Sequence, residues 1–162
     1  MKKITLFIAA AALFIAADVS AQMTMVRDGK AKSRIIVTTD QKPDSEAAVL
    51  LQDFVQRISG AVLPIVPADE VGKFLRKGDV LIGNGMTDTL YDVSESQEGE
   101  KVLKEDGFRL LTGDGRLRIA GGCDKGSIYG VVTLLEKYLG VSYWGENEYS
   151  LTKSRDVVLP EI

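Results

Sequence analysis

Two stretches of the chain place apolar residues at steps of three and four, which is the spacing of one helix face. The first is expected to form a helix over about residues 44–59, because Asp44 or Ser45 can cap its start and Gly60 follows its end. The second is expected over about residues 126–139, and a glycine again follows it. The pattern therefore predicts two amphipathic helices, each with one buried face.

Short β-branched or apolar runs around these helices have the composition of strands. The expected strands are residues 34–38, 61–66, 79–82, 108–112, 116–120, 141–144 and 157–159. The Gly-Asp-Gly sequence at 113–115 indicates a β-hairpin between two of them. Pro64 cannot donate a ladder hydrogen bond, so its strand is expected at a sheet edge or with a bulge. Residues 69–77 are expected to form a short helix, and the charged, weakly patterned residues 86–105 a loop.

This order of elements predicts an α+β fold, an α/β two-layer sandwich. We expect a mixed β-sheet of five to seven strands with the two main helices on one face, and right-handed crossovers in the helix-linked strand pairs. The folded domain is expected over residues 33–162, after a flexible lead-in over residues 22–32. Neither a repeat nor a low-complexity linker divides it.

Residues 1–21 have the pattern of a secretory signal peptide. Lys2 and Lys3 form a basic start, residues 6–17 an apolar core, and small residues lead to a cleavage position after Ala21. The apolar core is too short for a membrane span. We therefore expect an exported protein, periplasmic or extracellular after cleavage.

The composition restricts the chemistry that the chain can carry out. It contains no histidine, which removes the usual general base and the commonest metal ligand. Its single cysteine, Cys123, has neither a second thiol to pair with nor a histidine to activate it. The formal net charge of −3 argues against nucleic acid or an anionic membrane as a partner. We expect no catalytic residue, no cofactor and no metal.

Two other segments have features of binding sites. Residues 121–126 (GGCDKG) lie between a predicted strand and a predicted helix start, where phosphates bind. They lack both the G-x-G-x-x-G and the Walker spacing, so we interpret them as a tight structural turn. The acidic residues between 88 and 105 lack the spacing of a calcium loop, and we interpret them as solvated loop charge.

Three aromatic residues close to the end of the chain are the candidate contact residues: Tyr143, Trp144 and Tyr149. Aromatic rings stack on sugar rings and are enriched at protein interfaces, so these residues are expected to contact a partner or a sugar. For Trp144, which Gly145 and Glu146 follow directly, a place in the core and a place in an interface both remain open.

A series of short motifs keeps the order and spacing of one known family. They are Leu51-Gln52-Asp53-Phe54-x-x-Arg57-Ile58-Ser59-Gly60-Ala61-x-Leu63-Pro64-Ile65, Leu81-Ile82-Gly83, Asp106-Gly107-Phe108-Arg109, Leu117-x-Ile119-x-Gly121-Gly122, Gly126-x-x-Tyr129-Gly130-Val131 and Leu134-Leu135-Glu136-x-x-Leu139-Gly140-Val141-x-x-Trp144. Over about residues 34–159 the chain resembles the N-terminal accessory domain of α-glucuronidases and β-N-acetylhexosaminidase-like glycoside hydrolases, which has a zincin-like accessory fold. That name concerns topology, and without a His-Glu-x-x-His motif no zinc is implied.

In such enzymes the accessory domain precedes a (β/α)₈ barrel that carries the catalytic carboxylates. The residues up to Ile162 contain no barrel, so no catalytic residue of the family has a counterpart in this sequence. The resemblance therefore implies a non-catalytic accessory domain of an exported glycoside hydrolase, acting in carbohydrate metabolism. It would be either a truncated product or a stand-alone protein that packs on a catalytic glycosidase barrel. The second hypothesis is an exported glycan-binding module that uses exposed aromatic residues, and the third is an independent hydrolase.

Overall fold

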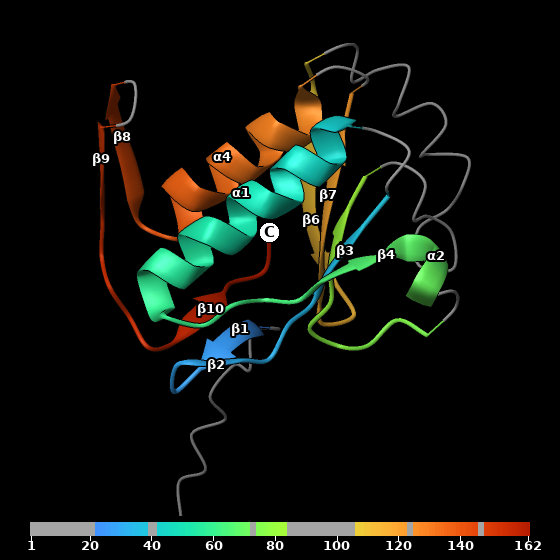
Figure 1. The fold of residues 1–162 in the computed structure, drawn as a ribbon, viewed down its shortest axis with the longest axis horizontal. Coiled ribbons are helices and arrows are strands. Elements are labelled where there is room, and N and C mark those ends of the chain that lie inside the picture. Colours follow the sequence, from blue (N-terminus) through green and yellow to red (C-terminus); the bar gives the residue numbers. More distant parts are fainter. Residues whose placement is uncertain (1–21, 39–41, 72–73, 84–105, 123–124, 146–147) are drawn as a thin grey trace, which may run out of the picture.

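A computed structural model describes residues 22–38, 42–71, 74–83, 106–122, 125–145 and 148–162 (Figure 1). Within these ranges the chain has an α+β fold. Its helices are α1 (Lys42–Ser59), α2 (Ala68–Val71) and α4 (Gly126–Tyr138). Its strands are β1 (Met23–Arg27), β2 (Lys30–Ala31), β3 (Ile35–Val37), β4 (Ile65–Pro67), β5 (Val80–Ile82), β6 (Phe108–Gly113), β7 (Arg116–Gly121), β8 (Val141–Gly145), β9 (Glu148–Leu151) and β10 (Val157–Leu159). These elements confirm the predicted fold class.

The central sheet has five strands in the order β4-β3-β5-β7-β6. The first four run parallel to one another, and β6 pairs antiparallel with β7 through the predicted hairpin. The sheet is therefore mixed, as predicted. β4 lies at its edge, which is the place that Pro64 predicted for that strand.

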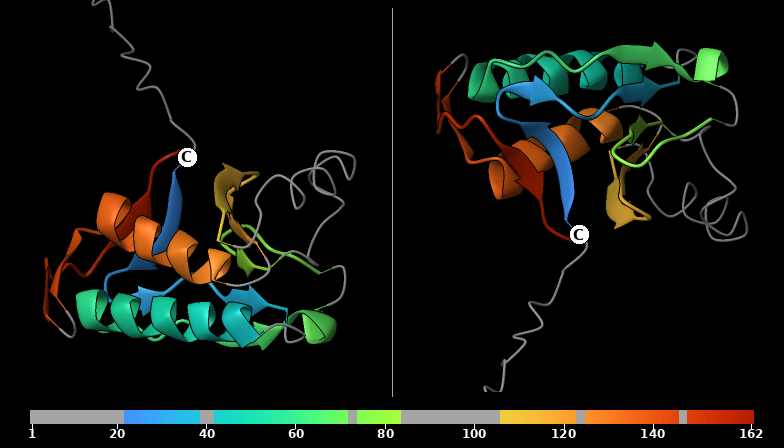
Figure 2. Two further views of the ribbon diagram at one scale, coloured as in Figure 1. Left: turned by 90° about the horizontal axis from the view of Figure 1, so that it is seen from above. Right: turned by 90° about the horizontal axis from the view of Figure 1, so that it is seen from below.

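The two long helices α1 and α4 pack side by side on one face of this sheet (Figure 2). Alternate strand residues such as Ile35, Ile82 and Ile119 face these helices and are fully buried with them. On the opposite face, Ile36 and Leu81 pack with Val71 of the short helix α2 in a smaller cluster. The prediction that both main helices cover one face is confirmed.

The prediction that residues 22–32 form a flexible lead-in was wrong, because β1 and β2 lie within this segment. β1 pairs with β10 and β2 in a second, three-stranded sheet, with Met23 opposite Leu159. Met23, Met25 and Val26 are buried in the main core. The partner strand lies at the other end of the chain, so local composition carries no sign of this pairing.

Smaller differences concern the ends of elements. α1 begins at Lys42, two residues before the predicted start, and β4 begins only at Ile65. α2 ends at Val71, whereas the predicted helix reached residue 77. β9 was not predicted, and it forms a separate two-stranded sheet with β8. The signal peptide at 1–21, the loop at 86–105 and Cys123 lie outside the described residues.

Among the helices that the structure describes, none is long and apolar enough to cross a bilayer.

Candidate functional site: a hairpin with an exposed tryptophan

The three aromatic candidates lie together on the β8–β9 hairpin, which stands beside one end of α1 and α4 (Figure 1). The antiparallel register places Tyr143 opposite Tyr149 and Ser142 opposite Ser150. Because neighbouring side chains on a strand point to opposite faces, the two tyrosines share one face and the two serines the other. We call the tyrosine face the inner face, since it packs on helix α1, and the serine face the outer face.

On the inner face both tyrosines pack against Phe54 of α1. Their ring centroids lie 5.7 Å (Tyr143) and 5.1 Å (Tyr149) from that of Phe54, with interplanar angles of 63° and 69°. This edge-to-face geometry is the one that aromatic pairs favour. Phe54 itself is buried. The two tyrosines therefore attach the hairpin to the helix.

Arg57, one helical turn after Phe54, completes this attachment. Its guanidinium lies 5.6 Å from the Phe54 ring centroid and 5.4 Å from that of Tyr149, so it stacks on both rings. Nη1 donates a hydrogen bond to the Tyr149 hydroxyl, and Nε donates one of 2.7 Å to Oδ2 of Asp53. The hydrogen bonds to Asp53 and then to Tyr149 raise the pKa of Arg57 above its usual value. Arg57 is therefore a permanent cation between helix and hairpin.

The pKa of Tyr143 is also raised above its usual value. Burial of the phenol is the main cause, and the negative charges of Glu136 on α4 and Asp53 on α1 add to it. Tyr143 is therefore a neutral side chain at physiological pH.

Trp144 lies on the outer face and is 74 % exposed. Its indole Nε1 donates a hydrogen bond of 3.2 Å to Oγ of Ser150. Ser142 and Glu148 are exposed on the same hairpin. Of the two alternatives left open by the sequence, the structure excludes the core position. The register between β8 and β9 shifts at this point, between Tyr143 and Gly145, and the hydrogen bond to Ser150 holds the indole on the side opposite the tyrosines.

The structure therefore brings the three predicted residues together but separates their roles. Tyr143 and Tyr149 are engaged with α1, and Trp144 is the one with a free ring face. Sequence reasoning missed Phe54 and Arg57 as part of the site. The Asp53–Arg57 spacing indicates an ion pair on the helix surface, but the Arg57–Tyr149 hydrogen bond joins residues 92 positions apart.

A buried polar cluster lies where β3 and β5 end and α1 and α4 begin. The Asp44 carboxylate accepts hydrogen bonds from Oγ1 of Thr38 (2.6 Å) and from Oγ of Ser127 (2.5 Å). Both of its oxygens are thus engaged. We interpret the cluster as structural, because it ties the starts of the two helices to the end of β3. Asp44 lies in the first turn of α1 and not at the predicted cap position.

The predicted tight turn after β7 is described in part, since residues 123 and 124 lie outside the described ranges. A Cβ at Gly121 would lie 2.1 Å from the Ser127 nitrogen, and one at Gly126 would lie 2.2 Å from the Gly107 oxygen. These glycines allow close backbone packing, which supports the structural interpretation.

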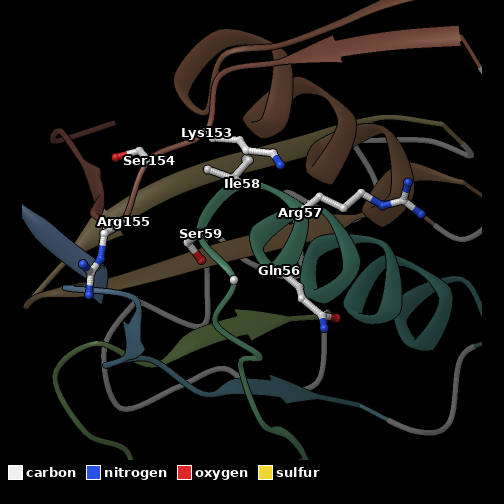
Figure 3. Close-up of a pocket in the computed structure, with 8 residues that line it drawn as sticks. Gln56, Arg57, Ile58, Ser59, Lys153, Ser154 and Arg155 are labelled. Carbon is white, nitrogen blue, oxygen red and sulfur yellow. The ribbon is translucent and has the colours of Figure 1, made fainter.

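A cavity of about 410 Å³ lies at the end of α1, beside the segment that follows β9 (Figure 3). Three basic residues line it, Arg57, Lys153 and Arg155. Figure 3 shows that their side chains point in different directions. Arg155 donates to the Asp28 carbonyl, and the Ser154 amide donates to the Ile58 carbonyl in the last turn of α1. The three basic groups therefore do not converge on one point in this cavity.

In the part of the chain that the structure describes, no three His, Cys, Asp or Glu side chains lie close enough to hold a metal ion. No protein-family profile matches the sequence, and no curated protein is significantly similar to it.

Proposed function

We propose that the chain is a non-catalytic accessory domain of an exported glycoside hydrolase and that it contacts a glycan through the outer face of the β8–β9 hairpin. The observation that carries the glycan contact is the exposed indole of Trp144, held by its hydrogen bond to Ser150. The accessory role and the export rest on the resemblance and the signal peptide pattern described above.

The chemistry of the outer face suits a sugar ring. A pyranose presents an apolar C–H face surrounded by hydroxyl groups, so it needs one flat apolar ring with hydrogen-bonding groups beside it. Trp144 supplies the ring, and the hydroxyls of Ser142 and Ser150 and the carboxylate of Glu148 supply polar groups on the same hairpin. No lysine or arginine belongs to the described hairpin residues, so the face lacks the charge that an anionic membrane attracts.

Trp144 is the only tryptophan of the sequence, so its fluorescence reports on this face alone. We expect a glycan of suitable structure, found by screening soluble polysaccharides against the purified exported chain, to shift the emission on binding. Trp144→Ala should weaken binding at least about tenfold, because an aromatic stacking contact contributes more than about 1.4 kcal/mol. Affinity electrophoresis measures this loss in the variant, which has no tryptophan signal.

Phe74→Ala is the matched control. Phe74 is 83 % exposed, and it belongs to the segment after α2, at the opposite end of the molecule from the hairpin in Figure 1. This variant should bind the glycan as the unmodified chain does. Equal binding by the Trp144→Ala variant, or equal losses in both variants, would contradict the proposed contact.

A second candidate function is docking on the catalytic barrel that the resemblance implies. The observation that favours it is an apolar depression of about 480 Å³ on the outer side of α1. Val49 and Leu50 lie in it, and Lys42, Glu46 and Asp53 surround them. Val49→Glu should abolish co-elution with a purified glycosidase barrel of that family and leave glycan binding at Trp144 unchanged. Unchanged co-elution would contradict docking at this face.

A further inference from the structure

We propose that Arg57 is a positioning residue for the glycan contact: it holds the β8–β9 hairpin on α1 and thereby sets the orientation of Trp144. The inference rests on the proposed function, because it assigns a role in the same contact to a residue that has no place on the outer face.

The hairpin needs such an attachment. Among the residues that the structure describes, β8 and β9 form a sheet of their own, with no ladder hydrogen bonds to the other two sheets. A single two-stranded hairpin is only marginally stable by itself in water. Its position is therefore set by side-chain contacts with its neighbours, and Phe54 and Arg57 supply those contacts from α1.

Arg57 is the polar centre of this attachment. Asp53, one turn earlier on the same helix, fixes the guanidinium through the 2.7 Å hydrogen bond. The guanidinium then stacks on the Tyr149 ring and donates to the hydroxyl of the same residue. One side chain thus restrains Tyr149 in two ways, so the tyrosine can neither rotate nor move away from α1 without losing both.

Tyr149 is connected both to the backbone beside Trp144 and to the residue that accepts the indole hydrogen bond. It pairs in register with Tyr143, the residue directly before Trp144. It also directly precedes Ser150, whose hydroxyl accepts the indole hydrogen bond. A shift of Tyr149 therefore displaces the backbone of Trp144 and the group that orients its ring.

The test compares Arg57→Ala and Arg57→Lys, first without glycan. In Arg57→Ala the Trp144 fluorescence should show lower anisotropy and stronger quenching by acrylamide, because the hairpin is less restrained. Glycan affinity should fall about tenfold. For both the Trp144 fluorescence and the glycan affinity, Arg57→Lys should give values between those of the unmodified chain and those of Arg57→Ala. An ammonium group keeps the charge but lacks the planar guanidinium that stacks on a ring and donates hydrogen bonds in parallel.

Arg27→Ala is the matched control. The Arg27 side chain is 52 % exposed, against 46 % for Arg57, and it too pairs with an aspartate, at 3.7 Å from Asp156. It lies on β1, and in the described structure its ion pair does not involve the hairpin. Its removal should leave the Trp144 signal and the glycan affinity unchanged.

Tyr149→Phe removes only the hydroxyl and keeps the packed ring, so it tests the same contact in a chain that retains its core. Tyr149→Phe should lower the anisotropy of Trp144 and increase its quenching by acrylamide, as Arg57→Ala does, but to a smaller extent. Unchanged anisotropy and quenching in Arg57→Ala and Tyr149→Phe, or changes equal to those of Arg27→Ala, would overturn the role of Arg57. Because the fluorescence is read without glycan, this failure is distinct from failure of the glycan contact, which Trp144→Ala reports.

Discussion

Individual residues with unusual backbone or burial show where the chain has little freedom. Gly83 follows β5 with a φ of 115°, a conformation that side chains other than glycine rarely adopt. A Cβ there would lie 2.1 Å from Oγ1 of Thr38 and 2.5 Å from Oδ2 of Asp44, so it would enter the hydrogen bond between them. This glycine is required by the polar cluster as well as by the backbone.

Gly83→Ala should therefore destabilise the fold by more than the roughly 1 kcal/mol that a positive φ alone costs. Displacing the Thr38–Asp44 hydrogen bond adds about 1–3 kcal/mol, because buried polar groups lose their partners. Gly60→Ala is the control: its φ is 79°, but nothing lies within 4 Å of the added Cβ. Urea unfolding measures both free energies, and equal losses at the two positions would show that the cluster contributes nothing.

At the scale of elements, the β8–β9 hairpin and helix α1 are joined through aromatic and charged side chains. Tyr143 is a titratable residue of this contact with a raised pKa, and the carboxylates of Glu136 and Asp53 contribute to that shift. Both carboxylates repel a tyrosinate. The attachment of β8–β9 is therefore expected to depend on pH in the alkaline range.

The direction follows from the raised pKa of Tyr143. The folded state holds the phenol proton more tightly than the unfolded state does. The contribution of Tyr143 to the stability of the fold is therefore complete below the pKa of the unfolded state, which is about 10. This contribution is lost as the pH rises through the higher pKa that Tyr143 has in the folded state. The quenching of Trp144 should accordingly increase above about pH 10. Tyr143→Phe should lack this part of the transition, and an identical transition in that variant would assign it to other groups.

At the scale of the whole molecule, the two ends of the described chain meet in the β10-β1-β2 sheet. This sheet places Met23, Met25 and Val26 in the same core as α1 and α4. The segment after the predicted cleavage position is thus part of the fold, and residues near opposite ends of the sequence stabilise each other.

Met25→Ala tests this arrangement. Met25 is fully buried, so truncation should lower the free energy of unfolding by about 2–5 kcal/mol. The same change in a flexible lead-in would have almost no effect. Thermal and urea unfolding give the value, and Arg27→Ala, an exposed position on the same strand, should cost less than about 1 kcal/mol.

The elements that the sequence predicted correctly are those with strong local signals. The helix periodicity between residues 44 and 59, the β-branched run at 34–38 and the Gly-Asp-Gly hairpin turn each depend on residues close in the chain. The signals fail where the partner is distant. β1 has its partner in β10, and β9 carries few apolar residues of its own.

The site divides in the same way. The sequence by itself determined that Tyr143, Trp144 and Tyr149 are close together and that Asp53 and Arg57 share a helix face, because spacing along a chain limits distance. Only the tertiary structure decided that the tyrosines pack on Phe54 and that Trp144 is exposed. The physical reason is that the register of β8 against β9 and their docking on α1 assign each side chain to a face. A shift of one residue would exchange those faces.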